Sequence, residues 1–140
     1  MRNIQMADAV ATQILFDGER TAIMKFTNIS DGTGETKVTK VDVSTLTPSS
    51  FDKACDGVTI TKIHALTHGM EVAMYWDATT DVLIAVVPQN NMYSMDLTQF
   101  GGLWNNAGAG KTGDIQFSTL DQTAGDTYTI ILEMVKSYAD

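Results

Sequence analysis

The sequence predicts an all-β fold: a single-domain antiparallel β-sandwich or barrel, for which jelly-roll topology is one option. Apolar and polar residues alternate with period two through most ordered-looking segments, which places successive side chains on opposite faces of a strand. Val, Ile, Thr and Tyr dominate these segments. Turn signals containing Asp and Gly separate them at short intervals, as is typical of sandwiches and barrels.

The elements follow in chain order. Residues 1–12 carry few strand or turn signals and are interpreted as an extended N-terminal arm that orders on a neighbouring subunit. Asp17-Gly18 then predicts a tight hairpin, because Gly accepts the positive φ of a type I′ turn. The alternating segments predict strands over 21–29, 36–44, 58–67 and 126–138.

Two further segments are read differently. The continuous apolar run "DVLIAVV", 81–87, predicts a strand that is buried on both faces. Residues 47–57 are expected to hold one helical turn, capped by Ser49 or Ser50. With 140 residues, the chain has the usual size of one domain, so residues 1–140 are treated as a single β domain.

The composition excludes some classes of partner. With 17 Asp and Glu against 9 Lys and Arg, the chain carries a formal charge of -8. A field of that sign repels phosphate backbones, and the scattered basic residues form no compensating run, so nucleic acid is not an expected partner. No apolar stretch approaches the ~18 residues of a membrane span, and no export signal is visible, so we expect a soluble protein without a membrane partner.

Three motifs suggest chemistry and fail on inspection. "GAGKT" ends like a phosphate-binding loop, but Asn105 stands where that loop needs its first glycine, and "DIQFST" follows as a strand rather than a helix. His64 and His68 have the spacing of a zinc helix but fall in a predicted strand, where they lie ~13 Å apart. Lone Cys55 reads as a passive residue.

Carboxylates cluster in two turns, Asp31 with Glu35 and Asp77 with Asp81, without matching the calcium loop of an EF-hand. No order of Ser, His and Asp points to a catalytic triad. The sequence therefore predicts a protein that is not an enzyme, with no catalytic residue, cofactor or metal site.

The stretch from Pro88 to Gly113 is rich in large apolar side chains, and "MYSMDLT" within it predicts another strand. If exposed, these side chains would anchor an interface; if buried, they would form a lid on the core. The candidate interface comprises these residues together with part of the arm: Ile4, Met6, Val10, Met92, Tyr93, Met95, Phe100, Leu103 and Trp104.

Three stretches resemble small structural proteins of tailed bacteriophages. They are "MADAVATQILFDGERTAIMKFTNISDGTGE" from Met6, "KIHALTHGMEVAMYWDATTD", and "FGGLWNNAGAGKTGDIQFSTLDQTAGDTYTIILEMVKSYA". The resemblance implies a virion component, most plausibly a capsid decoration (cement) protein that binds the outer shell and stabilises it. A neck, connector or tail component and a ligand-binding β-module remain alternatives.

That resemblance also sets expectations for partners and location. The partners would be the major capsid protein or other virion proteins, with the arm from Ile4 to Val10 and residues 92–104 as contact surfaces. Assembly would take place in the host cytoplasm, and the protein would end on the capsid surface. A homo-oligomer is expected, most simply a trimer at threefold lattice positions.

Overall fold

The structure is a computed structural model, and it describes residues 8–139. Its nine strands are β1 (Ala9–Asp17), β2 (Thr21–Asp31), β3 (Val38–Val41), β4 (Cys55–His68), β5 (Glu71–Trp76), β6 (Val82–Val87), β7 (Met92–Asp96), β8 (Ile115–Leu120) and β9 (Ala124–Tyr138). Two 3₁₀ turns, η1 (Val43–Thr45) and η2 (Thr98–Phe100), interrupt the connections. Within the described residues, no helix has the length and apolar character needed to cross a membrane.

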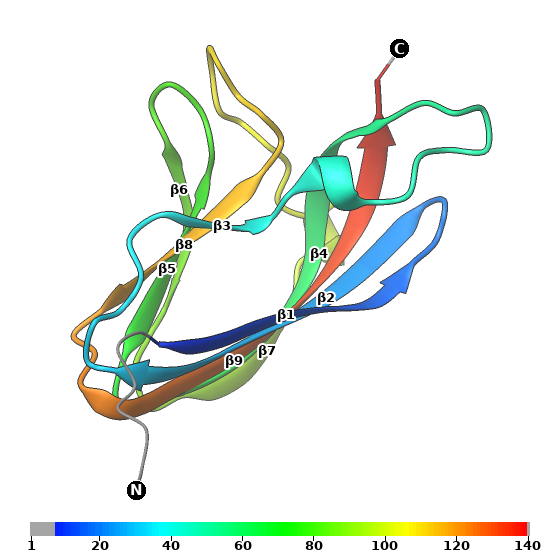
Figure 1. Cartoon of the computed structure of the whole chain (residues 1–140). Coiled ribbons are helices and arrows are strands. Elements are labelled where there is room, and N and C mark those ends of the chain that lie inside the picture. Colours follow the sequence, from blue (N-terminus) through cyan, green and yellow to red (C-terminus); the bar gives the residue numbers. More distant parts are fainter. Residues whose placement is uncertain (1–7, 140) are drawn as a thin grey trace, which may run out of the picture.

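The strands form two antiparallel sheets packed as a sandwich (Figure 1). One sheet has five strands in the order β1-β2-β9-β4-β7, and the other has four in the order β3-β8-β5-β6. This confirms the predicted all-β sandwich and excludes a closed barrel.

Strand pairing shows that the sandwich is a jelly roll. β2 pairs with β9, β3 with β8, β4 with β7 and β5 with β6. Among these eight strands the first therefore pairs with the last, the second with the second-last, and so on inward. Folding such a nested ribbon over itself gives two four-stranded groups, which is the jelly-roll arrangement. β1 is an addition to it, attached to the edge of β2 by the hairpin at Gly18.

The core lies between the sheets, where period-two alternation directs every second side chain. In β9 the inward series runs from Asp126 through Tyr128 to Lys136, and all six of its side chains are buried. Phe117 makes edge-to-face contacts with Phe26 and Tyr128, with ring centroids 5.1 and 5.9 Å apart. Each such fully buried aromatic side chain contributes about 1.5–3 kcal/mol.

Several predicted elements need correction. Residues 9–12, assigned to the arm, belong to β1 and pair with β2, while the rest of the predicted arm lies outside the described residues apart from Asp8. β3 covers only Val38–Val41 of the predicted 36–44, because the chain turns into η1. The hairpin forms at Asp17-Gly18, but Gly18 is not among the residues with positive φ, so the predicted type I′ geometry is wrong.

Two other predictions are wrong, the first for a local reason and the second because of the strand order. Residues 47–57 form no helix; backbone hydrogen bonds between Ser49 and residues 52 and 53 close a turn instead. β6 is not buried on both faces, because it is the edge strand of its sheet and Leu83 and Val86 are exposed. β5, which was not predicted, occupies the interior position between β6 and β8.

Candidate functional site

An aromatic cleft lies between β6 and the segment that follows β7. Phe100 and Trp104 are 64% and 66% exposed, unusual values for large aromatic side chains. The cleft measures about 260 Å³. We call it the aromatic cleft and define it by Trp76, Leu83, Ile84, Phe100, Leu103 and Trp104.

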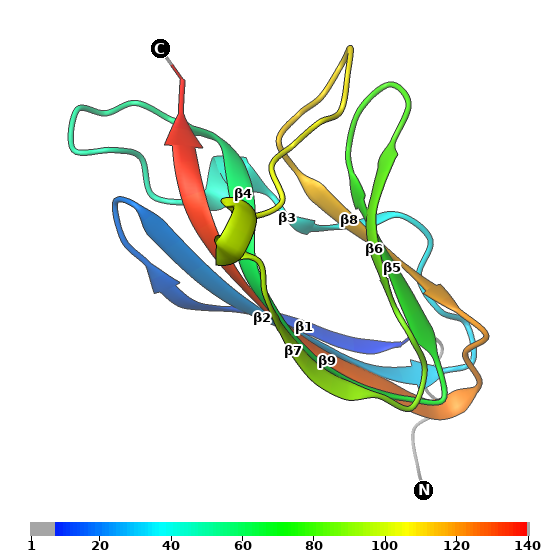
Figure 2. The same cartoon turned by 180° about the vertical axis from the view of Figure 1, so that it is seen from behind.

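Hydrogen bonds to β4 and a turn closed by the Asp96 side chain hold this segment in place. The Asp96 carboxylate accepts from the backbone N–H of Thr98 at 2.9 Å and from its hydroxyl at 2.5 Å, which closes the start of η2. These bonds from Thr98 hold the pKa of Asp96 below its ordinary value. The Leu97 N–H donates to the Thr61 carbonyl at 2.8 Å, so η2 lies against β4 (Figure 2).

The exit from η2 requires glycine. Gly101 and Gly102 have φ of 86° and 92°, in the region that favours residues without a side chain. A Cβ at Gly102 would lie 2.8 Å from the Ile60 carbonyl oxygen. The next residue, Leu103, exchanges two backbone hydrogen bonds with Ile60, at 3.0 and 2.8 Å. This close approach packs Leu103 against the core and leaves Phe100 and Trp104 in solvent.

β7 carries the remaining predicted interface residues, and it divides them. Met92 is 77% exposed and lines a shallow depression of about 190 Å³ with Leu66 of β4. Tyr93 packs partly against the core, and this burial raises the pKa of its hydroxyl. Met95 is exposed at the strand edge.

The predicted interface is therefore two depressions and not one surface. Phe100, Leu103 and Trp104 meet in the aromatic cleft, whereas Met92 and Tyr93 line the β4–β7 depression. Val10 lies on β1, at the other edge of the five-stranded sheet from β7. Ile4 and Met6 are outside the described residues.

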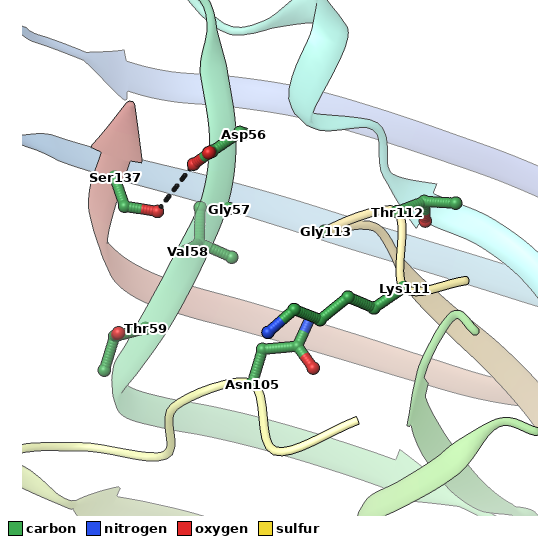
Figure 3. A pocket seen from close by; sticks show the side chains of 9 residues that line it. All are labelled: Asp56, Gly57, Val58, Thr59, Asn105, Lys111, Thr112, Gly113 and Ser137. Atoms are coloured by element: carbon green, nitrogen blue, oxygen red, sulfur yellow. Dashed lines mark hydrogen bonds between the residues drawn. The ribbon is translucent and has the colours of Figure 1, made fainter. Parts of the chain in front are cut away.

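A second, polar groove of about 460 Å³ contains the "GAGKTG" stretch. Figure 3 shows Asn105 and Lys111 on one side and Asp56, hydrogen-bonded to Ser137 at 3.0 Å, on the other. One lysine opposite a carboxylate is a poor anion site, and no helix begins here to supply backbone donors. The arrangement does not support phosphate binding.

Two of the three glycines in this stretch, Gly110 and Gly113, lie where a Cβ would clash. A Cβ at Gly113 would lie 2.2 Å from the Asp56 carbonyl oxygen, and one at Gly110 would lie 2.1 Å from the Thr79 hydroxyl. The turn is attached to the β5–β6 connection, where the Thr79 N–H donates to the Ala109 carbonyl at 3.1 Å. The resemblance to a nucleotide loop thus arises from close backbone contacts.

The outer face of the five-stranded sheet aligns a serine, a histidine and a glutamate, which sequence reasoning missed. The His64 Nδ1 atom lies 2.8 Å from the Ser94 hydroxyl, and its Nε2 atom lies 2.6 Å from a Glu133 carboxylate oxygen. His64 lies on β4, Glu133 on the neighbouring β9 and Ser94 on β7, the edge strand of the sheet. His64 and Ser94 also line the β4–β7 depression.

Acidic groups elsewhere are occupied in other ways. Glu35, considered above for calcium, is buried and pairs with Lys40, and it accepts a 2.7 Å hydrogen bond from Tyr128. Among residues 8–139, no three or more His, Cys, Asp or Glu side chains are placed to hold a metal ion.

The cleft residues that the sequence analysis missed are Leu83 and Ile84 of β6 and Trp76 of β5. The apolar run 81–87 contained the signal, but it was read as a strand with two buried faces. Nothing in the chain indicates which strand ends a sheet, since that depends on pairing between distant segments.

Comparison with known proteins adds no relative. No family model matches the chain, and no curated protein matches its sequence.

Proposed function

We propose that this chain is a structural subunit of a tailed-bacteriophage particle, a decoration protein that binds the outer surface of the assembled capsid. Its partner would be the major capsid protein, contacted through the aromatic cleft. The proposal begins from the likeness in sequence to small phage structural proteins. The observation that carries it furthest is the pair of exposed aromatic side chains, Phe100 and Trp104, on the segment that forms one side of the aromatic cleft.

Rigid exposed aromatics are what a binding surface needs. Such residues supply most of the binding energy at protein interfaces, since they bury a large area and lose little conformational freedom. Here residues 97–104 are held by the Gly102 approach to Ile60 and by the hydrogen bonds from Thr98 to Asp96, so little entropy remains to be lost on binding. A jelly-roll framework is also common in capsid proteins.

Repetition would give the contact its stabilising effect. Each subunit would place a small apolar anchor on the shell, and many copies on one lattice would act together against internal pressure. Single contacts could therefore be modest in area and still stabilise the particle.

Sedimentation with empty shells tests the proposal. The shells are assembled from the major capsid protein of the phage that would encode this chain, and the wild-type protein should pellet with them. Phe100→Ala and Trp104→Ala should each weaken binding by about tenfold or more, as expected for central aromatic anchors. Phe51→Ala is the matched control, because Phe51 is 85% exposed but lies in the distant 47–54 loop.

Other outcomes would redirect the assignment. Binding to purified tails or necks but not to shells would replace decoration by a neck, connector or tail role. No binding to any particle, or equal loss in Phe51→Ala, would overturn the proposal.

A ligand-binding module is the second candidate, and the observation in its favour is Trp104 at the mouth of a cleft. The cleft, at about 260 Å³, lies below the range of roughly 300–1,000 Å³ common for small-molecule pockets. Titration of soluble glycans while following the tryptophan fluorescence, to which Trp76 and Trp104 of the cleft both contribute, would distinguish the two. Saturable quenching by a glycan favours the module.

A further inference from the structure

β1 is an unusually exposed strand. It ends the five-stranded sheet, so that one of its edges has no partner strand within residues 8–139. Eight of its nine residues are exposed. Backbone N–H and C=O groups along such an edge are a template for pairing with another chain.

The strand lacks the usual protection against such pairing. Residues 9–16, AVATQILF, contain no charge and no proline. Val10, Ile14, Leu15 and Phe16 are each about half exposed, at 50, 48, 51 and 53%. One bulge occurs, between Ile14 and Phe16, and residues 9–14 pair regularly with β2. A long, flat, apolar edge of this kind is normally covered.

The opposing sheet does not cover it either. β1 makes the first sheet one strand wider than the second. Val10, Thr12 and Ile14 pair with Asn28, Phe26 and Met24, which face the core, yet they remain exposed.

We propose that a second copy of this chain covers the edge, with the two β1 strands pairing antiparallel across a twofold axis. A twofold axis perpendicular to the sheet keeps each side chain on its own face, so only residues of the same face can stand opposite one another. Placing the axis at Thr12 sets Thr12 against Thr12 and Val10 against Ile14 on both sides. These are favourable cross-strand pairs.

The neighbouring register is less favourable. With the axis at Gln13, Thr12 would stand opposite Ile14 of the other copy, which leaves the hydroxyl facing an apolar side chain. The Thr12 register is therefore favoured over the Gln13 register.

The net charge opposes association of two copies except through a surface that carries no carboxylates. Each copy carries a charge of -8, so association needs a contact free of carboxylates, and residues 9–16 supply one. The flanking carboxylates are already engaged: Asp8 accepts from Asn28 at 3.0 Å, and Asp17 accepts from Lys136 at 2.6 Å. In the Thr12 register, Asp8 stands opposite Phe16 and does not meet Asp17 of the other copy.

Light scattering behind a sizing column, over a range of concentrations, tests the pairing. The wild-type protein should be a dimer, and association should strengthen with added salt as repulsion is screened. Ile14→Lys should weaken association by about tenfold or more, because the added charges would be desolvated. Val86→Lys is the control, since Val86 is 42% exposed on β6, the edge strand of the other sheet, and lies outside the residues that define the aromatic cleft.

Cysteine cross-linking tests the register. Thr12→Cys should form a disulfide between copies on mild oxidation, because directly opposed Cβ atoms lie ~4.5–5.5 Å apart. Gln13→Cys should cross-link more slowly, since in this register Gln13 faces Ala11. The native Cys55 is buried and does not compete.

Each remaining outcome would overturn the inference. A wild-type monomer at every concentration, a trimer, faster cross-linking through Gln13→Cys, or dimerisation unaffected by Ile14→Lys would each do so. The pairing does not depend on the shell-binding role, because Ile14→Lys can fail to dimerise while still pelleting with shells through the aromatic cleft.

Discussion

Lys136 places a charge inside the sandwich. Its side chain is fully buried, and its ammonium donates to Asp17 at 2.6 Å, to the Gly18 carbonyl at 2.8 Å and to the Thr47 carbonyl at 2.7 Å. Burial alone would lower the pKa of this lysine, but the hydrogen bond to Asp17 helps to raise it. One side chain thus joins β9, the first hairpin and the loop after η1. The alternation along 126–138 put Lys136 on the inward face, although a charged residue is rarely buried.

Replacing this lysine should be costly. In Lys136→Met the Asp17 carboxylate and two carbonyls lose their shared donor, which should lower the free energy of unfolding by about 3 kcal/mol. The value is at the low end for a broken buried pair, because Asp17 stays partly accessible to water. Urea unfolding measures it, with Lys53→Met in an exposed loop as the control. Equal stability of the two variants would contradict the role assigned to Lys136.

At the scale of elements, η2 and the two glycines after it shape the aromatic cleft. Gly101 and Gly102 have nearly the same φ, but only Gly102 approaches another strand, whereas nothing lies within 4 Å of a Cβ at Gly101. Alanine substitutions at Gly101 and Gly102 therefore distinguish the free-energy cost of the backbone conformation from that of a steric clash.

Alanine at each position should give different results. Gly101→Ala should lose about 1–2 kcal/mol of stability from the left-handed conformation alone. Gly102→Ala should lose more, because its Cβ would push the segment away from Ile60. It should also weaken shell binding and alter the tryptophan fluorescence, to which Trp76 and Trp104 of the cleft both contribute. Urea unfolding with fluorescence detection measures both effects. If the two variants behaved alike, the close approach at Gly102 would not be what holds the cleft.

The elements predicted from sequence are those whose pattern is local. Alternation found β2, β4 and β9 because one face of each is buried along its length. The strand expected at "MYSMDLT" forms as β7, although four of its five residues are exposed and none is buried. It overlooked β5, whose outward-facing Ala73 is buried as well and breaks the pattern. The same limit applies to the site: Phe100 and Trp104 were identified from composition, whereas Leu83 joins them only through the sheet order.

For the whole molecule, several carboxylates respond to folding in the same direction. Burial would raise the pKa of Asp8, but hydrogen bonds from Asn28 and from backbone N–H groups outweigh it, and the pKa is lowered. Burial acts on Asp17 likewise, and hydrogen bonds from Lys136 and Thr47 again lower its pKa. A hydrogen bond from the Ala78 N–H lowers the pKa of Asp81. These groups lie at the start of β1, the first hairpin and the β5–β6 turn.

Asp114 acts against them. Burial is the main cause that raises its pKa, and the nearby charges of Asp42 and Asp77 add to it, more than the hydrogen bond from the Val43 N–H compensates. Ionised Asp114 therefore costs stability at neutral pH, and this cost is relieved on acidification. Several carboxylates have a lowered pKa, whereas Asp114 alone among these carboxylates has a raised one. The free energy of unfolding should therefore fall in acid.

The sign follows from linkage. A carboxylate whose pKa is lower in the folded state contributes stability above its unfolded pKa, near 3.9 for Asp, and loses it as pH falls through the folded value. The urea midpoint of the wild-type protein should therefore fall between about pH 5 and about pH 2. The urea midpoint of Asp17→Asn should be lower than that of the wild type at pH 7. It should also fall less on acidification, because the amide at position 17 does not take up a proton. Asp52→Asn, in an exposed loop, should follow the wild type. A constant difference between Asp17→Asn and wild type from neutral to acid pH would show that the Asp17–Lys136 pair does not link folding to protonation.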